Sequence, residues 1–382
     1  MALTALNPHS VGRFDIRQFS RRGARNPGVL SLAQGLFADG IRCFGLALAA
    51  LATAWPCLAQ DTSLWSYQGP DRSQKLAEAA RKEGTLTLYT SLSQKDLAPL
   101  LGPFEQKYDI KVKVWRSGSE NVLNRVVKER AARHSEVDAV HSSGLVMESL
   151  HREKVFHPVD SPYQKDLVPG ALRPHRGWAA TYLAVWVQAY NTNLVKKEDL
   201  PKTFADLLQP KWKGKLGIEA DVPEWYSTVV LSMGEEKGIK FFTDLVKQNG
   251  ISVRKGHSVL NNLVVAGDVP LALTDYSYMP ANSKKDGAPI DWFVLDPVVS
   301  SPSGVGVVLG APHPNAALLF YDYMLSTAGQ NGLLSLNYVP TNSKVPSPLG
   351  PLRTQMVDPA LALDQGEKWV KSFEEVVKLL RK

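Results

Sequence analysis

The sequence predicts an α/β fold with more than one folded unit. Between residues 85 and 152, a short strand, a serine-rich loop and a helix follow one another three times, and this order is typical of a parallel, doubly wound sheet. The chain has 382 residues, which exceeds one ordinary domain and favours two lobes. Its hydrophobic content of 44% and charged content of 21% are those of a globular protein.

The first 59 residues differ in composition from the rest of the chain. Six arginines and no lysine occur up to Arg42, and an uncharged apolar run follows from Cys43 to Trp55. This order is typical of a secretory signal, and the apolar run is shorter than the roughly 20 residues of a transmembrane helix. We therefore expect residues 1–59 to be an N-terminal extension and signal peptide that is cleaved after Ala59.

Both cysteines, Cys43 and Cys57, fall within this segment. The mature chain is therefore expected to contain no thiol, no disulfide and no cysteine-based metal site. The segment also carries six arginines and two aspartates, so its removal lowers the formal charge from +7 to about +3. Since most of the basic character belongs to the segment, we expect no nucleic-acid partner.

Each of the three repeated units places serines between its strand and its helix. The strands are expected at Thr85–Tyr89, Ile110–Trp115 and Val137–Val140, and each loop leads to a helix N-terminus, where free N–H groups and the helix dipole favour anions. Serine is also an ordinary helix N-cap, so a structural role is the alternative for any one loop. Because parallel strands end at one edge of a sheet, we interpret the loops together as candidate ligand-binding loops. Their serines are Ser91, Ser93, Ser117, Ser119, Ser142 and Ser143.

Other side chains can complete such a site. Arg116 or Arg125 can supply a guanidinium, which matches an oxyanion in bidentate geometry, although Arg125 lies within a predicted helix and a solvated position is its alternative. Trp225 and Tyr226 follow a turn that begins at Asp221 and can cover an organic ligand. Their alternative is a place among the core aromatics of a lobe.

A further candidate site follows the apolar run Val269–Leu273, which predicts a buried strand. The run gives way at once to polar and aromatic residues, and ligands bind beyond the carboxyl ends of strands in open α/β sheets. We therefore take Asp275, Tyr276 and Tyr278 as candidate ligand-binding residues. Two tyrosines that pack at the edge of a core are the alternative.

Several local strings, taken in order, resemble the periplasmic solute-binding proteins of ABC importers, in particular the group that includes the ferric-iron-binding proteins. The likeness extends from about Gly84 to Gln330. The strings are Tyr89–Phe104, Asp138–Val140, Ala189–Thr192, Trp212–Lys215, Ala266–Ala272 and Pro297–Gly310.

This resemblance implies a two-lobe fold of the periplasmic-binding-protein type 2, with a ligand cleft between lobes that two hinge crossings join. It places the crossings near Tyr182–Asn191 and Pro297–Gly306. The implied lobes are residues 60–183 with 301–382 for lobe 1, and residues 184–300 for lobe 2. The tyrosines of lobe 2 are then expected to face the serine loops of lobe 1 across the cleft, and hinge closure is expected to bury the ligand.

The resemblance leaves two ligand classes open. Ferric-binding members use a tyrosine pair at the end of the strand that precedes Tyr276, and here Ser277 separates Tyr276 from Tyr278. Where those members often have a histidine and a glutamate, this chain has Ser93 and Ser143. Two phenolates with Asp275 can hold Fe³⁺ if an exogenous anion completes the shell. The serines suit an organic carboxylate or phosphonate instead.

The function that the resemblance implies is capture of a small ligand in the periplasm and its delivery to an ABC permease in the inner membrane. The protein is then a monomer and not an enzyme, and Fe³⁺ is a transported ligand rather than a prosthetic group. A secreted hydrolase of the same fold is one alternative, but the chain contains neither G-x-S-x-G nor H-E-x-x-H. A ligand-presenting partner of a periplasmic sensor is another.

Overall fold

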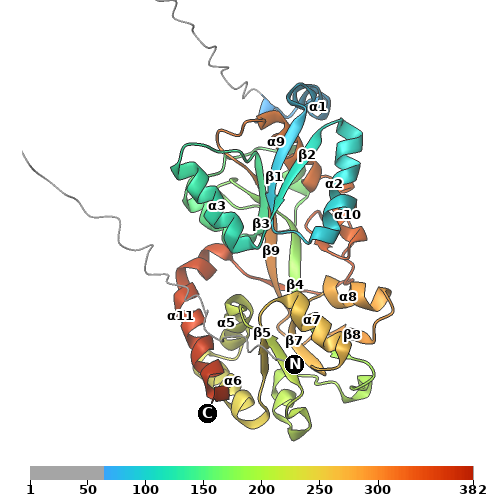
Figure 1. The fold of residues 1–382 in the computed structure, drawn as a ribbon, viewed down its shortest axis with the longest axis vertical. Coiled ribbons are helices and arrows are strands. Elements are labelled where there is room, and N and C mark those ends of the chain that lie inside the picture. Colours follow the sequence, from blue (N-terminus) through green and yellow to red (C-terminus); the bar gives the residue numbers. More distant parts are fainter. Residues whose placement is uncertain (1–63, 382) are drawn as a thin grey trace, which may run out of the picture. The chain divides into compact units, whose positions relative to one another are not determined.

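Two lobes that share two long strands make up residues 64–381, which are the residues that the computed structural model describes (Figure 1). The predicted signal peptide, its cleavage after Ala59 and both cysteines lie outside the described residues. No helix within residues 64–381 combines the length and the apolar character that a membrane crossing requires.

The sheet of lobe 1 begins with the three predicted parallel strands. Strand β1 pairs in parallel with β2 on one side and with β3 on the other, which confirms the parallel arrangement expected from the repeated units. Strands β9 and β4 then extend the sheet in antiparallel register. In spatial order these strands are β2 (Lys111–Arg116), β1 (Thr85–Thr90), β3 (Ala139–Ser143), β9 (Val299–Val307) and β4 (Ala179–Asn191).

Helices cover both faces of this sheet, because successive side chains of a strand point to opposite faces. Leu86 and Leu88 belong to one core cluster with Phe104 and Phe320, whereas Tyr89 belongs to a second cluster on the opposite face. Helices α1 (Arg72–Glu83), α2 (Gln94–Tyr108), α9 (Pro314–Leu325) and α10 (Thr327–Ser335) contribute to the first cluster, and α3 (Ser119–Ala131) and α4 (Gly144–Arg152) to the second.

A buried ion pair ties α1 to α9. The Nε of Arg72 lies 2.7 Å from Oδ2 of Asp322, and both side chains are at most 6% exposed. Arg72 also donates through Nη1 to the carbonyl oxygens of Leu64 and Tyr67.

We expect Asp322→Ala to lower the free energy of unfolding by about 3–5 kcal/mol, because the guanidinium of Arg72 would remain buried without its partner. Urea denaturation measures this loss. Asp244→Ala is the control, because it removes an exposed ion pair with Lys240 and should cost less than about 1 kcal/mol. Equal losses in the two variants would contradict the prediction.

Lobe 2 is a smaller sheet with helices on both faces. Strand β5 pairs in parallel with β6 and β7, and β7 and β8 pair in antiparallel register with the second half of β4. The strands are β5 (Leu216–Glu219), β6 (Ser252–Arg254), β7 (Leu271–Tyr276) and β8 (Ile290–Phe293). The helices are α5 (Pro223–Ser232), α6 (Glu235–Asn249), α7 (His257–Ala266) and α8 (Tyr278–Lys285).

Strands β4 and β9 form the two crossings, and Figure 1 shows them side by side between the lobes. Strand β4 pairs with β9 from Ala179 to Val185 and then with β7 and β8 from Trp186 to Asn191. All residues of both strands are buried. The backbones approach so closely that a Cβ on Gly304 would lie 2.4 Å from the carbonyl oxygen of Ala179, so this position requires glycine. Both crossings overlap the stretches that the resemblance implied.

Helix α11 (Pro359–Lys378) departs from the predicted lobe assignment, which placed residues 301–382 in lobe 1. Its first turns pair with lobe 1 through Arg173–Asp358 at 2.9 Å and Arg152–Asp364 at 2.8 Å. Farther along, Trp369 lies in the main core of lobe 2. The amphipathic pattern of a helix shows that one face is buried, but it does not show which core receives that face. The remaining lobe boundaries stay a prediction.

Candidate functional site

The six predicted serines lie at one edge of the lobe 1 sheet, where β1, β2 and β3 end. The hydroxyls of Ser91 and Ser142 lie 3.1 Å apart and join the first loop to the third strand. Ser142 and Ser143 still pair with β9 and therefore belong to β3 rather than to a loop. Ser117 accepts a hydrogen bond from the side chain of Asn121. Ser93 and Ser143 directly precede α2 and α4, and Ser119 is the first residue of α3.

None of these helices is capped by a serine side chain at its N-cap position. The first N–H groups of these helices therefore receive no hydrogen bond from an N-cap side chain. Arg116 is exposed at this edge and donates from Nε to the carbonyl oxygen of Leu92. Arg125 is engaged elsewhere, because it lies 4.5 Å from the ring centroids of both Tyr89 and Trp115 and pairs with Glu129 at 2.7 Å.

The two predicted tyrosines lie together at the end of β7. The strand is longer than expected and includes Tyr276, while Tyr278 begins α8. Their rings stack with centroids 5.8 Å apart and an interplanar angle of 14°. Both residues are partly buried, and no hydrogen bond joins either hydroxyl to another group within residues 64–381.

Two further tyrosines, which the sequence did not single out, continue this row of rings. Tyr338 lies 4.4 Å from Tyr278 and 4.5 Å from Tyr182, measured between ring centroids. At the other end, the ring of His257 lies 4.0 Å from that of Tyr276. Within the described part of the chain, no hydrogen bond links these tyrosines to the six serines. Their neighbours from the opposite lobe are aromatic rings instead.

The row of rings lies where the two lobes meet. Tyr182 and Tyr338 belong to a core cluster of lobe 1, and Tyr276 packs against that cluster and also against the main core of lobe 2. Tyr182 lies on the crossing strand β4. Side chains from both lobes and from a crossing therefore converge on one place.

Three carboxyl groups lie close to the row or to the crossing strand β9. The hydroxyl of Tyr338 donates to Asp96 at 2.6 Å, and Ser301 donates to Oε1 of Glu224 at 3.3 Å. Asp275 is fully buried. Its Oδ1 accepts a hydrogen bond from the backbone N–H of Tyr276 at 2.9 Å, and its Oδ2 has no partner among the described residues.

Burial shifts the pKa values of these acids upward. Desolvation raises the pKa of Glu224 to about 7, and that of Asp275 well above its ordinary value. Desolvation, followed by nearby acidic groups, raises the pKa of the Tyr276 and Tyr278 hydroxyls well above the ordinary value of 10.0. After desolvation, the largest contributions come from Glu224 for Tyr276 and from Tyr182 for Tyr278. Because these raised pKa values favour the protonated groups near neutral pH, a cation that binds to the phenol oxygens must displace protons.

The donor atoms suit a hard cation, since phenolate and carboxylate oxygens are the ligands that such ions prefer. No group of three or more His, Cys, Asp or Glu residues that could hold a metal ion occurs in residues 64–381. A metal ion here would therefore depend on tyrosine oxygens, as the sequence analysis expected for Tyr276 and Tyr278.

The structure places Trp225 and Tyr226 in the core of lobe 2, which agrees with their structural alternative. Trp225 is 1% exposed and packs edge-on against Phe204 and Phe242. Tyr226 is fully buried, and its hydroxyl lies 3.0 Å from that of Ser372. Neither ring has the exposed surface that covering a ligand requires.

The side chain of His141, next to the serines in β3, is buried and makes one hydrogen bond within residues 64–381. Its Nε2 lies 2.8 Å from the hydroxyl of Thr181, and its Nδ1 has no partner within the described residues. Burial lowers the pKa of His141 to about 4 from 6.5. Between pH 6.5 and pH 4, His141 therefore binds fewer protons in the folded protein than in the unfolded chain. Its contribution to the free energy of unfolding is complete above pH 6.5 and is lost as the pH falls towards 4.

Between pH 6.5 and pH 4, the free energy of unfolding of His141→Gln should fall less than that of wild type, by a difference on the order of 3 kcal/mol. Urea denaturation at a series of pH values between 6.5 and 4 measures it. His134→Gln, at a histidine whose side chain is 78% exposed, serves as the control. An identical pH profile in wild type and His141→Gln would contradict the expectation.

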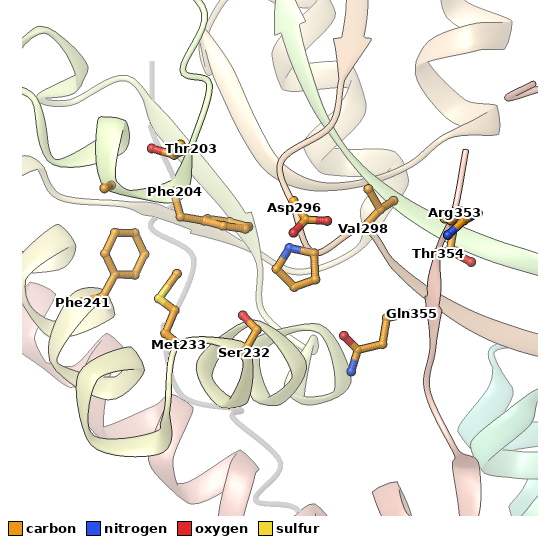
Figure 2. A pocket seen from close by; sticks show the side chains of 12 residues that line it. Thr203, Phe204, Ser232, Met233, Phe241, Asp296, Val298, Arg353, Thr354 and Gln355 are labelled. Carbon is orange, nitrogen blue, oxygen red and sulfur yellow. The ribbon is translucent and has the colours of Figure 1, made fainter. Parts of the chain in front are cut away.

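An open hollow of about 710 Å³ lies elsewhere and contains none of the predicted site residues. Figure 2 shows Phe204, Met233 and Phe241 of lobe 2 on one side of it, with Asp296 and the segment Arg353–Gln355 on the other. Its lining mixes apolar surface with a few polar groups, and it does not reach the tyrosine row.

Known proteins resemble this chain along most of its length. Iron uptake protein A1 of Synechocystis sp. is 26% identical over 310 residues, which are 75% of this chain and 85% of that protein. Iron-bound HitA from Pseudomonas aeruginosa superposes with a TM-score of 0.66 at 22% identity, over 76% of this chain and 99% of HitA. AfuA from Actinobacillus pleuropneumoniae, with fructose-6-phosphate bound, gives a TM-score of 0.66 at 21% identity, over 78% of this chain and 99% of AfuA.

These structural likenesses agree with the two-lobe fold described above. The family model described as bacterial extracellular solute-binding protein matches residues 135–357, which are more than half of the chain. The chain therefore belongs to the family of bacterial extracellular solute-binding proteins.

Proposed function

We propose that this solute-binding protein captures ferric iron between its lobes in the periplasm and delivers it to an ABC permease in the inner membrane. The observation that carries the proposal is the convergence of Tyr182, Tyr276, Tyr278 and Tyr338 among acidic groups where the lobes meet. Fe³⁺ is a hard cation that prefers such oxygen ligands. The related Iron uptake protein A1 and iron-bound HitA support the same ligand.

The tyrosines of lobe 2 supply the ligands in this proposal. The free hydroxyls of Tyr276 and Tyr278 are the first ligands, and the ring of the lobe 1 tyrosine Tyr338 lies 4.4 Å from that of Tyr278, measured between centroids. Since the pKa of both phenols is raised, iron must displace their protons, so affinity should increase with pH. In this proposal iron is cargo, and the protein carries no prosthetic group and performs no catalysis.

A second candidate ligand is an organic phosphate or carboxylate. It is favoured by the uncapped N-termini of α2, α3 and α4 and by the exposed Arg116 beside them. AfuA with fructose-6-phosphate provides a precedent in a protein of similar fold. The same N-termini can instead hold an anion that completes the coordination of iron, which is how the two parts of the site can act together.

Iron loading separates these candidates. The mature chain is titrated with ferric citrate while absorbance is recorded, and a phenolate-to-iron charge-transfer band is the expected result. Thermal-shift measurements with carboxylates, phosphates and fructose-6-phosphate in the absence of iron test the second candidate, because a tight ligand raises the apparent stability. A colourless protein without measurable iron affinity rules out the proposal.

Two further expectations belong to the same proposal. The protein acts as a monomer, which sedimentation of the mature chain tests. Its partner is a permease rather than a periplasmic sensor, and stimulation of transport in vesicles that contain the permease distinguishes the two. A ligand-dependent complex with a sensor domain, without any effect on transport, would favour the sensor alternative.

A further inference from the structure

Two asparagines join the lobes beside the tyrosine row. Asn282 of α8 accepts a hydrogen bond through Oδ1 from Nδ2 of Asn337 at 2.7 Å. Its own Nδ2 donates to the carbonyl oxygen of Leu336 at 3.4 Å, and both asparagines are partly buried. The amide of Asn282 therefore receives one hydrogen bond from the segment after α10 and donates another to it.

The two sides of this contact are fixed in different lobes. Helix α8 is held in lobe 2, where the hydroxyl of Ser283 accepts a hydrogen bond from the side chain of Asn261 of α7 at 3.0 Å. Leu336 and Asn337 follow α10, whose Leu333 is fully buried in a core cluster of lobe 1. Figure 1 shows α8 and α10 on one side of the crossing strands and α11 on the other. The contact is therefore a connection between the lobes in addition to β4, β9 and α11.

Asn337 occupies a backbone position that ordinarily favours glycine. Its φ angle of 63° is left-handed, and the N–H of the next residue, Tyr338, donates to the carbonyl oxygen of Leu333 at 3.1 Å, which is the longer bond of a Schellman helix end. Glycine adopts this conformation without steric cost, whereas asparagine is less common there. The helix end does not need the side chain of Asn337, and that side chain bonds to lobe 2.

The same face of α8 carries Tyr278. Tyr278 and Asn282 are four residues apart in the helix and therefore lie on one face of it. On the lobe 1 side, Tyr338 follows Asn337 directly, and its ring lies 4.4 Å from that of Tyr278, measured between centroids. A movement of α8 away from lobe 1 therefore breaks the amide pair and separates the two tyrosines together.

Resting on the proposed capture of ferric iron, we propose that Asn282 and Asn337 are positioning residues that hold the lobes closed over the ion. Their amide pair, with the bond to Leu336, forms a latch that exists only while the lobes are closed. The latch keeps α8, and with it Tyr278, against lobe 1. Because opening must break these bonds before the ion can leave, the latch slows release and leaves capture by the open form unchanged.

The test uses variants that remove the amides and keep the helices. Asn337→Gly retains the left-handed backbone, and Asn282→Ala places a good helix former in α8. The matched controls are Asp109→Gly, at an exposed left-handed residue after α2, and Asn331→Ala, at an exposed asparagine of α10. Thermal unfolding of the iron-free proteins verifies that all variants are folded.

Iron release is followed as the decay of the charge-transfer band after the loaded protein is mixed with excess citrate, and capture as its growth after the iron-free protein is mixed with ferric citrate. We expect release to be about fivefold faster in Asn337→Gly and about tenfold faster in Asn282→Ala, from the net contribution of one or two hydrogen bonds. The rate constant of capture should not change. Because the side chain of Asn337 bonds to Asn282, the double variant should release iron no faster than Asn282→Ala alone.

Wild-type release rates in both asparagine variants overturn the latch and leave the iron proposal standing. Additive effects in the double variant overturn the pairing of the two amides, and so does equally fast release in the two control variants. A colourless wild type overturns the iron proposal itself, and this inference with it.

Discussion

Replacing Tyr276 and Tyr278 together by phenylalanine should lower ferric affinity by at least about a hundredfold, or roughly 2.8 kcal/mol. The substitution removes both phenol oxygens but keeps the stacked rings. Because neither hydroxyl has a hydrogen-bond partner among residues 64–381, the iron-free protein should unfold at nearly the wild-type temperature. Competition with citrate measures the affinity, and loss of the charge-transfer band reports the missing phenolates.

Tyr190→Phe is the control for this double substitution. Tyr190 is a buried tyrosine of β4 outside the row, and its hydroxyl should be irrelevant to iron. Unchanged affinity and colour in the double variant would remove both tyrosines from the site. An equal loss in Tyr190→Phe would point to a general effect of tyrosine substitution on the fold.

Trp225→Ala should lower the free energy of unfolding by about 3–5 kcal/mol, which is typical of removing a large aromatic side chain from a core. Trp225 is 1% exposed, and its ring lies 5.9 Å from that of Phe204 and 5.8 Å from that of Phe242. Ligand affinity per folded molecule should be unchanged, since the ring does not reach the tyrosine row. Urea denaturation and a ligand titration on the same preparation measure both quantities.

Leu361→Ala provides the comparison for Trp225→Ala. Leu361 is 60% exposed in α11, so its truncation should change stability by less than about 0.5 kcal/mol. A small stability loss in Trp225→Ala together with weaker ligand binding would return Trp225 to the ligand-binding surface, the role first considered for it.

The sequence was most informative where structure is local. The three strand–loop–helix units of lobe 1 follow from apolar periodicity and loop composition, and the structure confirms their parallel pairing. It was less informative at β7, where Thr274 and Asp275 suggested that the strand had ended. Both residues are buried within the strand. The hydroxyl of Thr274 accepts a hydrogen bond from the backbone N–H of Glu219, so this polar residue makes a hydrogen bond inside the sheet.

The rest of the candidate site depends on contacts between distant parts of the chain. Tyr182 lies in an uninterrupted apolar run, and Tyr338 follows α10, so neither has a local signal that marks it as a ligand. They meet Tyr278 only because β4 crosses between the lobes and its neighbour β10 (Val339–Pro340) pairs with it beside Tyr182. Glu224 likewise has no local signal, because its contact with Ser301 of the crossing strand joins residues 77 positions apart in the chain.

The attachment of α11 to both lobes has a mechanical consequence. The two ends of this helix are held differently. Ion pairs whose carboxylates, Asp364 and Asp358, are 58% and 42% exposed hold its start, whereas Trp369 and Phe373 are buried in lobe 2. Each ion pair contributes up to about 1 kcal/mol, whereas withdrawing one such aromatic side chain costs about 3–5 kcal/mol. When the cleft opens, we therefore expect α11 to move with lobe 2 and to shift relative to α4. Because salt screens exposed ion pairs, the free energy cost of this shift should depend on the ionic strength of the medium around the protein.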